Sequence, residues 1–438
     1  MDNEAVVIGA GLAGLTAARM LSDRYDQVTV LDRDSLPDEP VPRRGVPQGS
    51  HPHILLASGL QELDTRFPGF EAELIAAGGT KFDTGTGLCS YRLGRRWPKA
   101  PTGVELVAAT RPLIEGLVRD RVTKLPGVTF RDQVAVSGLT GSSAGVTGVV
   151  LDAGETVGAD LVVDCTGRGA RSDRWLTALG LRAPAQLEVK VGVAYATRLY
   201  RRRPGDLPDW EAVFTLPTSP HERVDGLAIP VEGDRWMIGI GGWHFPEVPT
   251  DVEAFERFAR ELPDPMLSEL IGRAEPLTDI VVAKFPSSRR RLFEQLENPP
   301  PGYVALGDAI CSFNPIYGQG MTCAAFSARA LGEALDKHPS GTAMARDYYA
   351  AVAQIVETPW QFAVGGDFAY PQTTGPRPRD IKLRNWYSRQ IAYASQIDAG
   401  VNRAFVRVQQ LLDPPSVLMK PEFVLRVLRR ARERKRQG

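Results

Sequence analysis

The sequence predicts an α/β protein that consists of a Rossmann-like domain, an inserted domain with a mixed or antiparallel sheet, and a helical C-terminal region. Three observations predict this architecture. The chain opens on an apolar run, a glycine-rich turn and a helical stretch, and a similar pattern begins again at Tyr303. Several runs between these two patterns alternate between apolar and polar residues, as half-buried strands do.

The first pattern is a complete nucleotide-binding motif. Residues 5–8 are apolar, and Gly9, Gly11 and Gly14 follow with the spacing G-x-G-x-x-G. The first glycine permits a tight turn, the second lets the backbone approach a pyrophosphate, and the third lets the helix pack close to the strand. Free amides at the start of the helix attract phosphate. The residues between these glycines, Ala10, Leu12 and Ala13, are further candidates for binding the nucleotide.

An acidic residue completes this motif. The apolar run 28–31 ends in Asp32, close to the distance of about 20 residues at which a ribose-binding carboxylate is expected. Its neighbour Arg33 is a further candidate for the same site. The complete unit predicts a dinucleotide site and does not identify the dinucleotide.

The second pattern places another carboxylate at the end of a strand. Residues 303–306 are apolar and run into Gly307-Asp308, so we expect this acid at the carboxyl edge of a parallel sheet, where ligands bind. A loop and the start of a helix follow, whose amides can face an electron-rich oxygen. The candidate site residues in this loop and at the start of this helix are Pro315, Ile316, Tyr317, Gly318, Gly320 and Met321.

These patterns divide the chain. We expect a discontinuous nucleotide-binding domain at 1–185 and 283–345, a substrate-binding sheet domain at 186–282 and a helical region at 346–438. The sheet domain should supply an apolar wall to a substrate pocket. The candidates for this wall, on whichever face of the strands turns inward, are Tyr195, Phe214, Trp236, Ile238, Ile240 and Trp243.

Composition excludes several classes of protein. The 52 basic residues balance the 52 acidic ones, which argues against binding to nucleic acid. The four cysteines are far apart in the sequence, so we expect neither a metal site nor a disulfide, and a cytoplasmic location. No apolar run is long enough for a transmembrane segment. The basic segment 423–436 predicts an amphipathic helix, either packed by its apolar stripe or available to a membrane, a carrier protein or an acidic synthase.

The two motifs together resemble those of FAD-dependent monooxygenases of the para-hydroxybenzoate-hydroxylase-like class, over residues 1–335 at least. This resemblance implies that the first motif binds the ADP half of FAD. It also implies that Asp308 contacts the ribityl chain and the pyrophosphate, and that Gly320 and Met321 lie near the isoalloxazine. Amides at that point would stabilise the anionic reduced flavin.

Residues 43–53, Arg-Arg-Gly-Val-Pro-Gln-Gly-Ser-His-Pro-His, narrow the resemblance. Together with the chain length they are similar to a bacterial subgroup that includes polyether-pathway olefin epoxidases and, more distantly, squalene epoxidase. By this resemblance one of the paired arginines, with Arg44 preferred, reaches FAD. The other positions that match cofactor-binding residues are Val46, Arg111 and Val134. His51 and His53 have either a structural role in this loop or a direct one in the chemistry.

One motif departs from the family pattern. Gly-Ala-Asp-Gly-x-x-Ser is replaced by a segment that starts at Asp164 and ends in Arg171-Ser172. Asp164 keeps its place among the candidate cofactor residues. Because this motif is tied to FAD and nicotinamide handling, the electron source is either NAD(P)H directly or a separate flavin reductase.

The resemblance implies that reduced flavin and O2 form a C4a-hydroperoxide, which transfers one oxygen atom to an electron-rich substrate. Epoxidation of an olefin in a polyketide or isoprenoid natural product is the favoured reaction, because no base is evident near the flavin motifs. The substrate would be an apolar small molecule, free or carrier-bound. An aromatic hydroxylase and an FAD-dependent isoprenoid reductase or dehydrogenase are the alternatives. A halogenase is disfavoured by the absence of a Trp-x-Trp-x-Ile-Pro stretch, and a non-enzymatic flavin-binding module is the remaining possibility.

Overall fold

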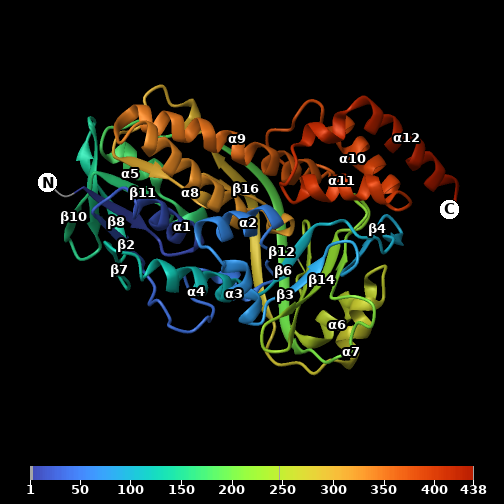
Figure 1. Cartoon of the computed structure of the whole chain (residues 1–438). Coiled ribbons are helices and arrows are strands. Elements are labelled where there is room, and N and C mark those ends of the chain that lie inside the picture. The colour runs from blue at the N-terminus through green and yellow to red at the C-terminus, as the bar shows by residue number, and fades with distance from the viewer. Residues whose placement is uncertain (1–2, 246, 438) are drawn as a thin grey trace.

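Two large sheets organise the computed structural model, which describes residues 3–245 and 247–437. Figure 1 shows the parallel sheet with its helices on the left and the larger mixed sheet in the centre and lower right. The C-terminal helices lie above the mixed sheet (Figure 1). This arrangement confirms the predicted α/β fold class with a helical C-terminal region.

The parallel sheet has the strand order β17-β11-β1-β2-β7. Its strands are nearly continuous apolar runs, as expected for a sheet covered on both faces. Helices α1, α4 and α8 pack together beside it, and β9 contacts β11. The bounds are β1 Glu4–Ile8, α1 Leu12–Leu21, β2 Gln27–Leu31, α4 Arg111–Val122, β7 Val128–Arg131, β8 Val136–Ser142, β9 Gly145–Leu151, β10 Thr156–Gly158, β11 Leu161–Asp164, α5 Ser172–Ala178, β17 Tyr303–Ala305 and α8 Gly320–Lys337.

The mixed sheet has the strand order β18-β16-β12-β15-β14-β13-β4-β5. It therefore includes strands from outside the expected limits of 186–282, because residues 88–96 join one edge and residues after 282 join the other. The bounds are β4 Leu88–Arg92, β5 Arg95–Arg96, β12 Gln186–Arg201, β13 Ala212–Thr215, β14 Val224–Val231, β15 Arg235–Gly242, β16 Val281–Arg291 and β18 Cys311–Ser312. Helices α6 (Val252–Glu261) and α7 (Met266–Arg273) contact β15 and β14, respectively.

The remaining elements connect the two sheets or form the C-terminal region. Between the nucleotide motif and β4 lie α2 (Ala57–Arg66), α3 (Phe70–Ala76) and β3 (Thr80–Asp83), which pairs with β6 (Glu105–Ala108). After α8 come α9 (Gly341–Asp367), α10 (Ile381–Ser395), α11 (Ala399–Gln409) and α12 (Pro421–Arg436).

The terminal helix α12 is packed against the protein. Its apolar stripe buries Val427 and Ala431, and Arg426 and Arg430 donate to the carboxylate of Asp398 at the start of α11. This geometry favours the packed alternative for the basic segment. Among the described residues, no helix is both long and apolar enough to cross a membrane.

Candidate functional site

The glycine-rich turn joins β1 to α1 at very short range. Gly9 has φ +102°, which only glycine adopts without strain. A Cβ at Gly14 would lie 1.8 Å from the carbonyl oxygen of Gly9. The helix therefore packs directly on the turn. Leu12 is buried behind it, and the amide of Ala10 donates to Asp32 at 2.6 Å.

Gly11 faces two guanidinium groups and one carboxylate. A Cβ at this position would lie 3.9 Å from Nη2 of Arg43, 3.9 Å from Nη2 of Arg111 and 4.0 Å from Oε2 of Glu115. Gly11 also precedes α1, whose first amides have no side-chain cap. A backbone that admits close approach, free helical amides and two guanidinium groups make a donor set that fits a phosphate.

Arg43 is held in place by three carboxylates. Its nitrogens lie 3.1 Å from Asp32, 3.1 Å from Asp34 and 2.9 Å from Glu115. Beside this cluster the amide of Val134 donates to the carbonyl of Asp32 at 2.8 Å. The structure therefore places Val134 beside Asp32, next to the turn.

The structure differs from the prediction at the paired arginines. Arg43, rather than Arg44, lies against the turn, and both Arg44 and Arg33 are exposed. The reason is local: Arg43 folds inward onto the acidic cluster, and the next side chain then points away from it. Val46 is buried in the same loop and its amide donates to the carbonyl of Arg43.

The second motif meets the first in space. Gly307 has φ +65°, and a Cβ there would lie 3.1 Å from the Cβ of Ala13 on α1. Burial raises the pKa of Asp308, and the positive charges of Arg111 and Arg168 oppose that shift. A Cβ at Gly320 would lie 3.5 Å from Oδ1 of Asp308. The structure thus brings Arg111 of the first half beside Asp308 of the second, with Met321 buried behind them.

Hydrogen-bond donors of the protein surround the carboxylate of Asp164. Its carboxylate is fully buried and accepts hydrogen bonds from Thr166, Ser172 and Tyr303 at 2.5, 3.0 and 2.9 Å. These donors join β11, α5 and β17. Because its oxygens are satisfied by the protein, Asp164 holds these elements together; its place among the candidate cofactor residues stays a prediction.

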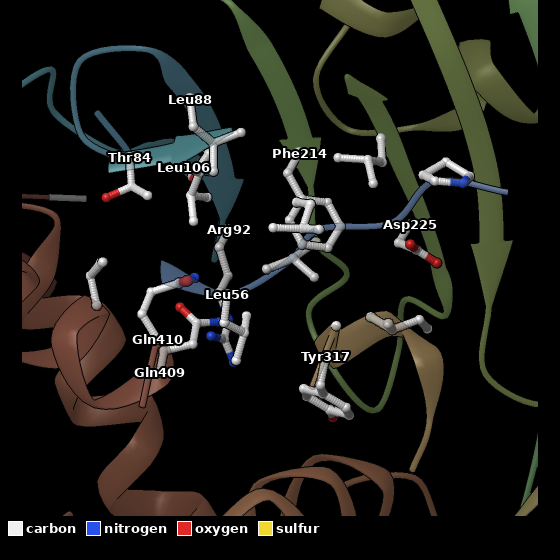
Figure 2. A pocket seen from close by; sticks show the side chains of 18 of the residues that line it. Leu56, Thr84, Leu88, Arg92, Leu106, Phe214, Asp225, Tyr317, Gln409 and Gln410 are labelled. Atoms are coloured by element: carbon white, nitrogen blue, oxygen red, sulfur yellow. The ribbon is translucent and has the colours of Figure 1, made fainter. Parts of the chain in front are cut away.

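A cavity of about 200 Å³ lies between the second motif and the mixed sheet. One wall is formed by Pro315, Ile316, Tyr317 and Gly318, and helix α11 forms another. The sheet supplies alternate residues of neighbouring strands (Figure 2). These are Leu88, Ser90, Arg92, Tyr195, Thr197, Phe214, Leu216, Asp225, Leu227, Gly239 and Gly241.

Two of the six predicted wall residues, Tyr195 and Phe214, line this cavity. Trp236, Ile238 and Ile240 lie on the opposite face of β15, which packs on α6 and α7. Strand alternation explains the difference, because Gly239 and Gly241 take the cavity side. Trp243 is also away from the cavity lining: its indole stacks on Tyr370 and donates to Asp367 at 2.8 Å.

Both loop histidines line the cavity in neutral form. Nδ1 of His51 lies 2.8 Å from Oγ1 of Thr197, and Nδ1 of His53 lies 2.9 Å from the carbonyl oxygen of His51. Burial lowers the pKa of His51 to about 4 and that of His53 to about 3. They are therefore uncharged at neutral pH.

The polar residues of the cavity are not evident from the sequence motifs. Asp225 is buried on β14, its Oδ1 has no hydrogen-bond partner among the described residues, and burial raises its pKa to about 7. Arg92 on β4 and Gln409 at the end of α11 also line the cavity. A charged residue in an otherwise apolar alternating strand was the available signal for Asp225. For Arg92 and Gln409 no local signal exists, because distant segments bring them here.

Comparison with known proteins agrees with this geometry. The model of the FAD binding domain family matches residues 2–361. Protein Rv3254 of Mycobacterium tuberculosis is 34% identical over 439 residues, covering 96% of this chain and 91% of that protein.

Solved structures share the fold at low sequence identity. The flavin-dependent brominase Bmp2 is 15% identical with a TM-score of 0.69, covering 100% of both chains. PqsL of Pseudomonas aeruginosa, a probable FAD-dependent monooxygenase, is 16% identical with a TM-score of 0.60, covering 92% of this chain and 99% of that one. The chain belongs to the FAD binding domain family and is a flavoprotein with the fold that FAD-dependent monooxygenases and halogenases share.

Proposed function

We propose that this protein is an FAD-dependent monooxygenase that inserts one oxygen atom of O2 into an electron-rich substrate held in the cavity. The main support for this proposal is the cavity. It is lined by the Pro315–Gly318 loop and by a sheet face that bears the buried carboxyl group of Asp225. The overall reaction is substrate, O2, two electrons and two protons giving the oxygenated product and water. Bound FAD supplies the activation of O2 once it is reduced.

The chain's own residues would hold FAD at the glycine turn and the second motif. Arg111 and the amides after Gly11 would donate to the pyrophosphate, and Arg43, fixed by its carboxylates, would lie beside it. Asp308 would lie beside the connecting chain of the cofactor. Val46 and Val134 would border the nucleotide end. The shared environment of Arg111 and Asp308 supports one continuous site across both halves of the domain.

We favour hydroxylation of an aromatic ring bearing a hydroxyl or amino group over epoxidation. Asp225 would supply a base that the motifs do not reveal: its Oδ1, without a partner among the described residues, can accept the proton of a phenol and so raise the electron density of the ring. Epoxidation needs no such group. It remains the second candidate, since Phe214, Leu216 and Leu227 form an apolar surface that also suits an olefin.

A separate experiment on the same protein identifies the electron donor. Either NAD(P)H reduces the bound FAD directly or a partner flavin reductase does so. Rapid bleaching of the FAD absorbance by NADPH or NADH alone, with substrate present, supports the direct route. Bleaching that requires an added flavin reductase supports the partner.

The decisive experiment is turnover under 18O2. Purified holoenzyme would be supplied with a reductant and with a panel of phenols, aminobenzenes and terminal alkenes, and products would be analysed by mass spectrometry. We expect products that carry one 18O atom, with phenols converted faster than alkenes. Products that are only reduced, formed equally well without oxygen, would overturn the proposal in favour of a reductase or dehydrogenase.

A further inference from the structure

A buried carboxyl group joins the Pro315–Gly318 loop to the mixed sheet. Oδ1 of Asp367, the last residue of α9, accepts from Nδ2 of Asn314 at 2.7 Å and from Nε1 of Trp243 at 2.8 Å. Asn314 immediately precedes the loop, and Trp243 directly follows β15. One oxygen atom therefore receives a donor from the segment that continues each of two cavity walls.

Asn314 passes this contact on to the loop. While its Nδ2 donates to Asp367, its Oδ1 accepts from the amide of Ile316 at 3.2 Å. Its backbone carbonyl accepts from the amide of Tyr317 at 3.3 Å. Because both ends of its side-chain amide have partners, the orientation of that amide is fixed, and it fixes the first turn of the loop.

The loop also packs closely on the end of α9. A Cβ at Gly366 would overlap the hydroxyl group of Tyr317, so the absence of a side chain there makes room for this ring. Ile316 and Tyr317 pack against the buried cluster that contains Trp243. Figure 2 shows Tyr317 across the cavity from Phe214 of the sheet. A shift of the loop would therefore change the width of the cavity.

Asp367 is itself held from behind. Its backbone carbonyl accepts from Oγ1 of Thr373 at 2.6 Å, and that oxygen lies 3.0 Å from Nε2 of His244. The next residue, Thr374, forms two backbone hydrogen bonds with Lys190 of β12. The match to the FAD binding domain family ends at residue 361, so this chain supplies the anchor from beyond the matched part.

A carboxyl group at this place is costly for the fold. Asp367 is fully buried, its Oδ2 has no hydrogen-bond partner among the described residues, and burial raises its pKa to about 7. The titratable groups that face it are the hydroxyl groups of Tyr317 and Tyr370, which bring no positive charge. A well-packed apolar residue is often at least as stable at such a place, which points to a role beyond packing.

We propose that Asp367 is a positioning residue, which fixes the Pro315–Gly318 loop against the end of β15 and so sets where bound FAD lies relative to the cavity. It acts on the flavin through Asn314 and the loop. The inference rests on the proposed function for the place of FAD beside this loop. The anchoring of the loop itself can be measured without turnover.

The test measures hydrogen exchange of the loop by mass spectrometry and the visible circular dichroism of bound FAD, on oxidised holoenzyme without reductant. Asp367→Leu removes the shared acceptor, so amide exchange in the loop should become at least about 10-fold faster and the dichroism of FAD should change. Asp367→Asn keeps an oxygen for both donors, so exchange should stay within about twofold of wild type and the dichroism should be retained.

Trp243→Phe removes only the donor from the sheet and keeps an aromatic ring against Tyr370. It should accelerate loop exchange by about three- to fivefold, between wild type and Asp367→Leu. Retention of FAD and the melting temperature establish folding of each variant. If Asp367→Leu does not retain FAD, the comparison of Trp243→Phe with Asp367→Asn decides in its place.

Asp264→Leu is the matched control. Asp264 is also buried, and it accepts from Arg96 of β5 and from the amide of Met266 in α7, on the packed side of the sheet. Its replacement should lower the melting temperature and leave both loop exchange and the dichroism of FAD unchanged.

Four results would overturn the inference. They are unchanged loop exchange in Asp367→Leu, equal acceleration in Asp264→Leu, an Asp367→Asn variant as perturbed as Asp367→Leu, or faster loop exchange with unchanged dichroism. If exchange and dichroism change as expected but the wild-type protein forms no 18O-labelled product, the positioning role stands and the proposed function falls.

Discussion

The two faces of the mixed sheet use the same strands for different purposes. The face toward α6 and α7 is a dry core that includes Ile238, Ile240 and Trp236. The cavity face carries Gly239 and Gly241 on the same strand, with Asp225 on the next. Because side chains alternate with a period of two, one strand sequence encodes both faces. The comparison teaches that stability and substrate handling can be altered separately in this domain.

Truncation on the packed face should have the largest effect. Ile238 is fully buried, so Ile238→Ala should lower the free energy of unfolding by about 2–5 kcal/mol through lost burial and the cavity left behind. Urea denaturation at pH 7 measures this change. Leu227→Ala, on the cavity face, is the matched variant and should cost markedly less, because part of its side chain already borders open space. Equal costs would contradict the division between the two faces.

Removal of the carboxylate on the cavity face should affect turnover instead. Asp225→Asn keeps the shape and removes the base, so we expect turnover of a phenol to fall by about 100-fold or more. Steady-state oxygen uptake measures the loss, and FAD retention reports on folding. Turnover of an alkene by the same variant is the internal control and should change little. A normal rate with phenols would remove Asp225 from the chemistry.

The raised pKa of Asp225 predicts that stability and turnover depend on pH in opposite directions. The pKa of Asp225 is raised from 3.8 to about 7, so the folded protein binds more protons than the unfolded chain between about pH 4 and 7. Its contribution to the free energy of unfolding is therefore lost as the pH rises through that window. Turnover should rise over the same range because the base must be ionised. Both dependences should disappear in Asp225→Asn, as measured by unfolding and by pH–rate profiles.

Crowding the cavity face should have a smaller effect. A Cβ at Gly241 would lie 3.0 Å from the Cβ of Tyr195 and 3.1 Å from Oδ1 of Asp225. Gly241→Ala should therefore cost about 1–3 kcal/mol of stability and slow turnover by displacing the carboxyl group. Thermal unfolding and steady-state rates measure the two effects. A variant with unchanged rate and stability would show that the glycine is not needed for clearance.

The sequence predicted the parallel sheet better than the cavity, for a physical reason. The turn from Gly9 to Gly14 is local, so its glycine spacing specifies its conformation. The cavity depends on non-local pairing: the parallel pair of β13 and β4 brings Ser90 beside Phe214. Alternation in β15 was visible, but it could not tell which face turned inward. The choice between Arg43 and Arg44 depended on where a cluster of distant carboxylates lay.

The smallest effect tests whether the two faces are independent. Gly272 lies in helix α7 behind the packed face, and a Cβ there would meet no atom within 4 Å. Gly272→Ala should therefore raise the free energy of unfolding by about 0.5–1 kcal/mol, because alanine loses less backbone entropy in a helix. Urea denaturation measures the gain, while turnover should remain unchanged. Combined with Asp225→Asn, it should raise stability but not rate. A restored rate would show that the low activity of Asp225→Asn came from a loosened fold rather than from the missing carboxylate.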